Sequence, residues 1–183
     1  MNVEWEKLVA RKSDLIEKRF FSEKFNDRAL LIGALTRNAF LNDHLDCDEL
    51  KNNGTQDRFH TLGDTILDFI IFDHFAQKSK ESPEIRYSPE QLNKFREIYG
   101  KNEHLHTFSK NVIELQRYVI WGSDEKAKKR WVESDWILGD LFEALIGAIY
   151  IDKGLDGVNI FVGTIKFFEN MDKLFSPENR TDV

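Results

Sequence analysis

The sequence has little that would place the protein outside the cell or in a membrane. Cys47 is the only cysteine, so no internal disulfide can form, which agrees with a reducing cytoplasm. No apolar run approaches the ~18–20 residues that a helix needs to span a bilayer. The first 20 residues include Glu4, Glu6, Asp14 and Glu17, a composition that excludes a signal peptide. We therefore expect a cytoplasmic protein without membrane association.

The sequence also lacks an excess of positive charge. The 26 Lys and Arg residues are outnumbered by 32 Asp and Glu, giving a net charge of −6 and a sequence pI near 5.4. This balance counts against a general nucleic-acid binder, whose surface is usually basic. A local basic patch, or metal ions held by acidic side chains, would have to compensate. The 41% hydrophobic and 32% charged residues are typical of one globular domain with a sizeable core.

Strand-like alternation and internal repeats are both lacking, so we predict an all-α fold. The first 20 residues and the segment beginning at Asn26-Asp27 show helical periodicity. Residues 41–56 are polar and contain Asn52-Asn53-Gly54, which predicts a loop. Residues 58–77 are apolar on most of the helix surface, which predicts a buried central helix.

The second half of the chain begins with a sharp helix start. In Ser88-Pro89-Glu90-Gln91, Ser88 is the predicted N-cap and Gln91 completes a capping box, and Gly100 is placed to end this helix. We then expect short helices from residue 103 and over 115–120, a turn at 121–123, and a long helix over about 132–152 stopped by Gly154. A last amphipathic helix covers about 157–174. Residues 1–175 are predicted to form one domain, and residues 176–183 a disordered tail.

Two segments place acidic side chains inside otherwise apolar helices. Buried carboxylates are unfavourable unless they are paired or bind a metal. Asp57, His60 and Asp64 are separated by three and four residues, so they share one face of a helix. Asp140 and Glu143 likewise share a face in the second segment. These spacings predict two acidic helix faces.

The second segment also contains small residues, Ala144, Gly147 and Ala148, which would let its helix approach another helix closely. If the two acidic faces meet, three carboxylates and an imidazole converge. Such a cluster can hold Mg²⁺ against a phosphodiester, activate water and stabilise the leaving oxygen. Carboxylates that are merely solvated, or that lie in the first turn of a helix, are the alternative. Spacing alone leaves both interpretations open.

The first acidic segment resembles the signature of the ribonuclease III family. Residues 57–67 read D-R-F-H-T-L-G-D-T-I-L, where the family has E-R-L-E-F-L-G-D-A-V-L. Residues 30–38, 88–102 and 140–154 resemble three further family stretches in the same order, so the likeness covers roughly residues 15–172. The resemblance implies the all-helical endonuclease-domain fold of that family.

Site residues follow from the resemblance position by position. It implies that Asp64, Asp140 and Glu143 bind metal, with Asp64 and Glu143 as the catalytic residues. Asp57 occupies the position of the first signature glutamate, close to the catalytic valley. His60 stands where the second signature glutamate, normally a metal ligand, is expected. A neutral imidazole carries no negative charge and prefers softer ions than Mg²⁺. The resemblance therefore implies Mg²⁺ or Mn²⁺ as the metal. The histidine leaves three consequences open: weaker Mg²⁺ binding, a changed metal preference or a loss of cleavage.

The activity implied is that of a homodimeric endoribonuclease. It would cleave double-stranded or structured RNA with metal-activated water, leaving a 5′-phosphate and a short 3′ overhang. Family members dimerise through the signature helix, and the aromatic residues of that helix suit an interface, although core packing explains most of them. These aromatic residues are Phe59, Phe69, Phe72 and Phe75. The family's double-stranded-RNA-binding domain is expected to be absent, because the chain ends shortly after the last predicted helix.

A basic run precedes the second acidic segment and is the candidate RNA-binding element. It consists of Lys126, Lys128, Lys129 and Arg130. Such a run can hold phosphates, and a solvated loop is the alternative. His104-x-His106 is too slight for a zinc site without cysteines or a third clustered histidine. Two other functions remain open. One is a catalytically silent dimer that acts as an RNA or ribonucleoprotein scaffold, for which His60 is the discriminating residue. The other is a nucleotide phosphohydrolase, which would usually show more metal-binding histidines.

Overall fold

The computed structural model describes residues 3–45, 47–82 and 84–175, and the predicted tail at 176–183 lies outside them. Within the described residues the fold is helical, as predicted, and the β-type pairing is a single parallel bridge between Thr36 and Ile120. No described helix is long and apolar enough to cross a membrane. In chain order the elements are α1 (Val3–Phe20), α2 (Arg28–Leu35), α3 (Asn38–Asp43), α4 (Asp48–Asn53), α5 (Asp57–Glu81), α6 (Pro89–Tyr99), α7 (Asn102–Asn111), the 3-10 helix η1 (Leu115–Arg117), α8 (Ser123–Ala127), α9 (Arg130–Glu133), α10 (Ile137–Thr164) and α11 (Phe167–Phe175).

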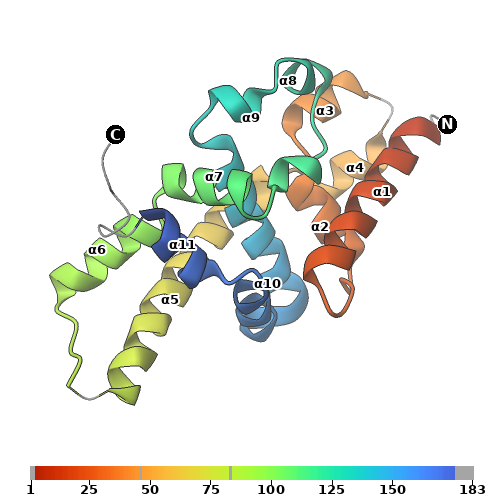
Figure 1. Ribbon diagram of the computed structural model, residues 1–183. Coiled ribbons are helices and arrows are strands. Elements are labelled where there is room, and N and C mark those ends of the chain that lie inside the picture. Colours follow the sequence, from red (N-terminus) through yellow and green to blue (C-terminus); the bar gives the residue numbers. More distant parts are fainter. Residues whose placement is uncertain (1–2, 46, 83, 176–183) are drawn as a thin grey trace.

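Helix α10 lies at the centre of the molecule, with α2, α5 and α7 packed around it (Figure 1). Nearly every residue of its first half is buried, whereas α5 buries one face and leaves Phe69 50% exposed. Residues 58–77 therefore do form a helix, as predicted. The prediction that this helix is the central one is wrong, because α10 occupies that position. Side chains in the first half of α10 meet neighbours on nearly all sides, so this half is largely apolar apart from Asp140 and Glu143.

The closest approach in the fold is the crossing of α5 and α10. A Cβ atom added to Gly63 would lie 1.7 Å from the carbonyl oxygen of Glu143, and one added to Gly147 would lie 2.4 Å from that of Phe59. No side chain fits at either position, so the two backbones are in direct contact there. Gly147 of the second acidic segment thus has the predicted role, and Gly63 is its partner on α5.

Several local predictions are confirmed in atomic detail. The hydroxyl of Ser88 accepts a hydrogen bond from the backbone N–H of Gln91, and the Gln91 side chain accepts one from the backbone N–H of Ser88. This capping box begins α6, and Gly100 ends it. The connection that follows places Asn102 at the first position of α7.

Three segments differ from the predictions. Residues 41–56 contain α4 and the end of α3, because buried Cys47 and Leu50 anchor this polar stretch to a small second core. The helix expected over 115–120 is reduced to the 3-10 turn η1, preceded by Glu114 with a φ of 54°. The helix expected over 157–174 is interrupted at Lys166, with a φ of 48°, whereas Gly154, with a φ of 67°, does break the helical backbone of α10 at a kink where the stop is predicted.

The α5–α10 contact makes a stability prediction. Gly63→Ala should destabilise the protein by about 3 kcal/mol or more, because the added methyl group overlaps a backbone carbonyl that cannot move alone. Gly163→Ala is the matched control: it lies in the last turn of α10, where an added Cβ meets nothing within 4 Å. Urea unfolding of the two variants measures the difference. Equal stability of both variants would contradict the close crossing.

Candidate metal centre

The α5–α10 crossing brings three potential metal ligands together. His60 lies one turn before Gly63 on α5, and Glu143 lies one turn before Gly147 on α10. The His60 Nε2 atom is 2.9 Å from Glu143 Oε2 and 3.5 Å from Asp140 Oδ1. One ligand atom from each of these three residues lies within 4.8 Å of the others. The two acidic helix faces therefore meet as expected, with His60 at their junction.

Glu143 is the buried member of this cluster, with only 4% of its surface exposed. Burial, together with the carboxylates of Asp64, Asp140 and Asp68, raises the pKa of Glu143 to about 8. Without a cation, Glu143 is therefore largely protonated at neutral pH, and its Oε2 lies 2.9 Å from His60 Nε2. The crowding of carboxylates that raises this pKa, in a donor set of oxygens and one imidazole, fits a divalent cation.

The other two predicted site residues lie beside this close group. Asp64 is one helical turn beyond His60 and acts on Glu143 through its charge, but it is not among the three residues whose ligand atoms converge. Asp57 is exposed, and its carboxylate accepts hydrogen bonds from the side chains of Asn38, at 2.5 Å, and Gln56, at 3.2 Å. Both contacts hold Asp57 at the start of α5.

Known proteins resemble this chain over most of its length. The Ribonuclease-III-like family model matches residues 27–167. The chain belongs to this family. Ribonuclease 3 of Streptococcus uberis is 32% identical over 148 residues, which are 81% of this chain and 60% of that protein. Ribonuclease 3 of Streptococcus mutans is 34% identical over 79% of this chain and 58% of its own length. The chain thus spans about 60% of the curated relatives that it matches.

Solved structures agree with the ribonuclease III fold. One nuclease domain of ribonuclease III from Campylobacter jejuni, described as flexible in a region involved in dimer formation, superposes with a TM-score of 0.66. It is 26% identical in sequence, and the match covers 84% of this chain and 96% of that one. A second structure of that nuclease domain has a TM-score of 0.65 at 24% identity and supports the fold alone.

Two residues that the sequence did not single out support the ribonuclease III-like centre. The Asn102 side chain donates a hydrogen bond to Asp140 Oδ1 at 2.5 Å, while its own buried Oδ1 has no partner among the described residues. Gly139 permits this approach, because a Cβ there would lie 1.8 Å from Asn102 Oδ1. Asp68, one turn beyond Asp64, is paired with Arg96 at 2.6 Å. The position of Asn102 at the end of a family-like stretch was its only sequence signal.

The start of α10 is fixed by side chains that accept its first N–H groups. Ser134 Oγ accepts from the backbone N–H groups of Trp136 and Ile137, both at 3.1 Å. His106 Nδ1 accepts from the N–H of Leu138 at 3.2 Å. Burial, aided by the charge of Lys110, lowers the pKa of His106 and keeps this lone pair available. His106 is thus a structural residue that sets the register of Asp140 and Glu143.

The predicted basic run is exposed and partly neutralised. It spans α8 and α9, where Lys128 is paired with Asp124 at 2.7 Å and Arg130 with Glu133 at 3.2 Å. Among the described residues, no ion pair involves Lys126 or Lys129. Two of the four expected RNA-binding cations therefore have acidic partners within four residues of themselves.

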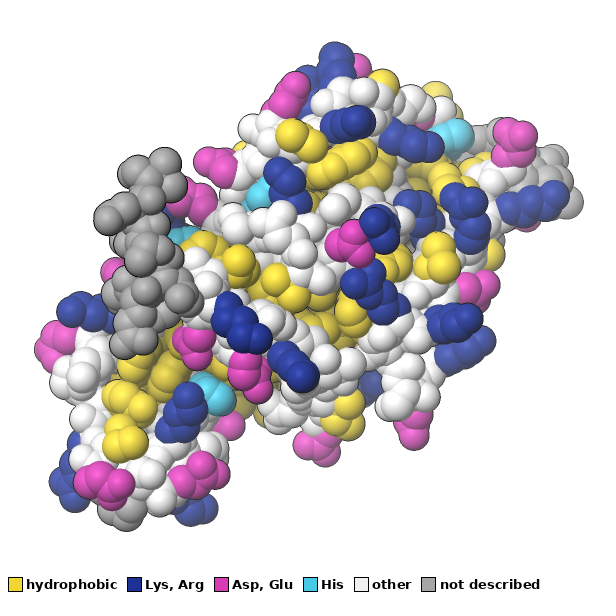
Figure 2. Space-filling model, in the orientation of Figure 1, with side chains coloured by type: hydrophobic (Ala, Val, Ile, Leu, Met, Phe, Trp, Pro, Cys, Tyr) yellow, Lys and Arg dark blue, Asp and Glu magenta, His cyan; other side chains and the backbone are white. Residues whose placement is uncertain are grey.

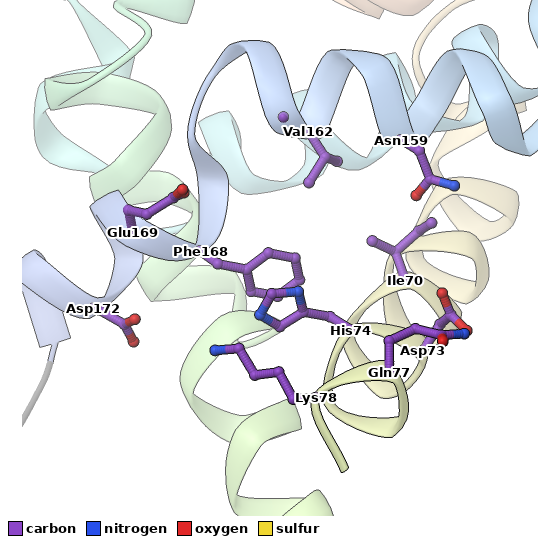
Figure 3. Close-up of a pocket in the computed structure, with 11 residues that line it drawn as sticks. Ile70, Asp73, His74, Gln77, Lys78, Asn159, Val162, Phe168, Glu169 and Asp172 are labelled. Carbon is purple, nitrogen blue, oxygen red and sulfur yellow. The ribbon is translucent and has the colours of Figure 1, made fainter. Parts of the chain in front are cut away.

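A cavity in the described part of the chain lies away from this centre. It encloses about 510 Å³ between the second half of α5, the end of α10 and α11, where His74 stacks on Phe168 at 3.6 Å (Figure 3). The cluster on α5 and α10 sits instead at the surface, with 38% of the His60 side chain exposed and 20% of Asp140. A centre at the surface is accessible to a polymer, whereas an enclosed cavity would suit a small molecule.

The raised pKa of Glu143 makes a pH prediction for the metal-free protein. The unfolded chain loses this proton near 4.5 and the folded chain near 8, so stability is lost as the pH rises between these values. The loss reaches at most about 1.4 kcal/mol per pH unit. Glu143→Gln should remove it, while Glu97→Gln, at an exposed position on α6, should not. Urea unfolding in EDTA from pH 5 to 8.5 measures this, and identical pH profiles for Glu143→Gln and the native chain would contradict the account.

Proposed function

We propose that this protein is a metal-dependent endoribonuclease that cleaves double-stranded or structured RNA. The observation that carries the proposal is the convergence of His60, Asp140 and Glu143 where α5 crosses α10. The names of its relatives, Ribonuclease 3, and its place in the ribonuclease III-like family support the same activity. We expect products with a 5′-phosphate and a short 3′ overhang, as the family resemblance implies.

Asp64, Asp140, Glu143 and His60 are the residues that would hold Mg²⁺ or Mn²⁺. When bound, such an ion supplies an activated water and neutralises charge at the leaving oxygen. The protein's own contribution is orientation: Asn102 fixes one oxygen of Asp140, and the crossing holds His60 against Glu143. Glu143 must release its proton to act as a ligand, because a carboxylate coordinates in its ionised form. An imidazole in the ligand set shifts preference from Mg²⁺ toward Mn²⁺.

The ligand set predicts how cleavage depends on side chains. Asp64→Asn and Glu143→Gln should each reduce cleavage of labelled duplex RNA by about 100-fold or more. His60→Glu should raise the Mg²⁺-supported rate relative to the Mn²⁺-supported rate, because it restores a carboxylate at the junction. Single-turnover rates in each metal measure both effects. If His60→Ala cleaves as fast as the native chain with the same metal preference, His60 has no role as a ligand.

The same experiment separates the second candidate function. The scaffold interpretation is based on His60. This residue replaces a carboxylate that is a metal ligand in the family, so the site has one negative charge fewer to hold a metal. A scaffold would bind duplex RNA, and both the native chain and His60→Glu would be inert in Mg²⁺ and Mn²⁺. Cleavage by the native chain would exclude it.

We further propose that two copies associate through α5. Phe59 and Phe75 of the predicted aromatic face are core residues, but Phe69 is half-exposed, and Leu62 and Ile66 lie on the same stripe of the helix with partial exposure. The Campylobacter jejuni neighbour, described by its region of dimer formation, supports an interface in this family. An apolar stripe of this kind favours association with a like surface.

The proposed dimer has a direct test. Phe69→Asp should convert the dimer to a monomer, since a charge would be buried at the interface without a partner. Ile160→Asp, at a position that is 62% exposed on α10, is the control and should stay dimeric. Sedimentation velocity at micromolar concentration measures the mass. A native chain that sediments as an active monomer would refute the interface.

A further inference from the structure

A second cluster of positive charge surrounds a cavity that lies apart from the metal centre. The cavity, of about 260 Å³, is enclosed by α1, the end of α3 and the start of α8. Arg11 and Lys12 of α1, His44 after α3 and Lys126 of α8 line it, with Trp121 among the apolar residues of its wall. Lys and Arg side chains predominate on the face over α1 and toward α8 (Figure 2). We call this cavity the α1–α8 pocket.

The charges of the α1–α8 pocket are not balanced from within. None of its lining residues is acidic. Two carboxylates on the adjoining elements are already engaged: Glu125 is bound by both Nε and a terminal nitrogen of Arg37, at 3.0 and 2.7 Å, and Asp43 accepts from the backbone N–H of Ser123 at 2.5 Å. These contacts hold α8 against α3. They leave the pocket with an excess of positive charge.

Lys12 is the central cation of this pocket. It is half-buried, and its ammonium group donates to the carbonyl of Arg117, which fixes it in place. Burial, together with the charges of Arg11 and Lys126, lowers the pKa of Lys12 to about 8. The positive charges of Arg11 and Lys126 thus disfavour the protonated form of Lys12, and an anion bound among the three side chains would favour it. Lysine and arginine donors around a wall of mixed polarity are suited to a phosphate oxygen.

We propose that the α1–α8 pocket binds a backbone phosphate of duplex RNA, so that α1 forms part of the RNA-binding surface. This inference rests on the proposed function for its ligand. It also changes the importance of the basic run: Lys126 faces the pocket, whereas Lys128 and Arg130 are paired with acidic neighbours. Affinity for RNA then comes from cations on two separate parts of the chain rather than from one loop.

The test measures binding of a duplex RNA with 5′-hydroxyl ends by anisotropy, in EDTA and over a range of salt concentrations. Lys12→Gln and Lys126→Gln should each weaken binding about three- to tenfold near 0.1 M salt and lower the log–log salt slope by about 0.7–0.9. Lys18→Gln, exposed on the same helix but outside the pocket, is the matched control and should change the slope less. Lys126 is exposed, so its variant separates RNA binding from any effect of Lys12→Gln on folding.

Each outcome decides the assignment. If the native chain binds RNA and the pocket variants bind equally well with unchanged slopes, the pocket assignment is wrong and the proposed function stands. If the pocket variants weaken binding only of a 5′-phosphorylated duplex, the pocket binds a terminal phosphate, and the proposal of a backbone phosphate is wrong. If the native chain binds no RNA, the proposed function fails, and inorganic phosphate becomes the probe. Amide NMR shifts at Ser123 that disappear in Lys126→Gln would then support a phosphate pocket, and no shifts would exclude it.

Discussion

The contact between the backbones of α5 and α10 determines the geometry of the whole candidate site. At Gly63 and Gly147 the helices approach until an added Cβ would overlap a carbonyl oxygen of the other helix. Residues one turn from this contact must therefore meet, and these are His60 and Glu143. The packing of α10 among α2, α5 and α7 keeps the crossing from relaxing. A wider crossing, built on alanine, would separate the acidic faces and leave two ordinary helix surfaces.

The crossing also brings carboxylates close together, so that they repel one another. Glu143 is buried beside three other carboxylates, which is why its pKa rises to about 8. In the described structure three groups offset this repulsion. They are the imidazole of His60, the amide of Asn102 and the proton on Glu143. A divalent cation would replace the proton and stabilise the same arrangement, so the features that weaken the metal-free fold are those that favour metal binding.

Much of this site could be predicted from the sequence, because helical spacing alone puts His60 near Asp64 and Asp140 near Glu143. The small residues after Glu143 also indicated a close helix partner. Spacing could not show that Asp64 stands outside the closest group, since that depends on the angle between the helices. Asn102 was missed because it reaches the site from a third helix. The pairing of the basic run could also be anticipated, because Asp124 and Glu133, which are paired with Lys128 and Arg130, lie three or four residues from these cations in the sequence.

The central claim is that the crossing gives this ribonuclease III-like protein a centre with a nitrogen ligand at His60. The most direct measurement is electron spin echo spectroscopy of Mn²⁺ added to the purified protein. The account predicts nitrogen modulation from one histidine, which disappears in His60→Ala and persists in His74→Ala, because His74 lines the cavity between α5, α10 and α11, away from this centre. Bound Mn²⁺ in the native chain without nitrogen modulation, or modulation that survives in His60→Ala, would contradict it.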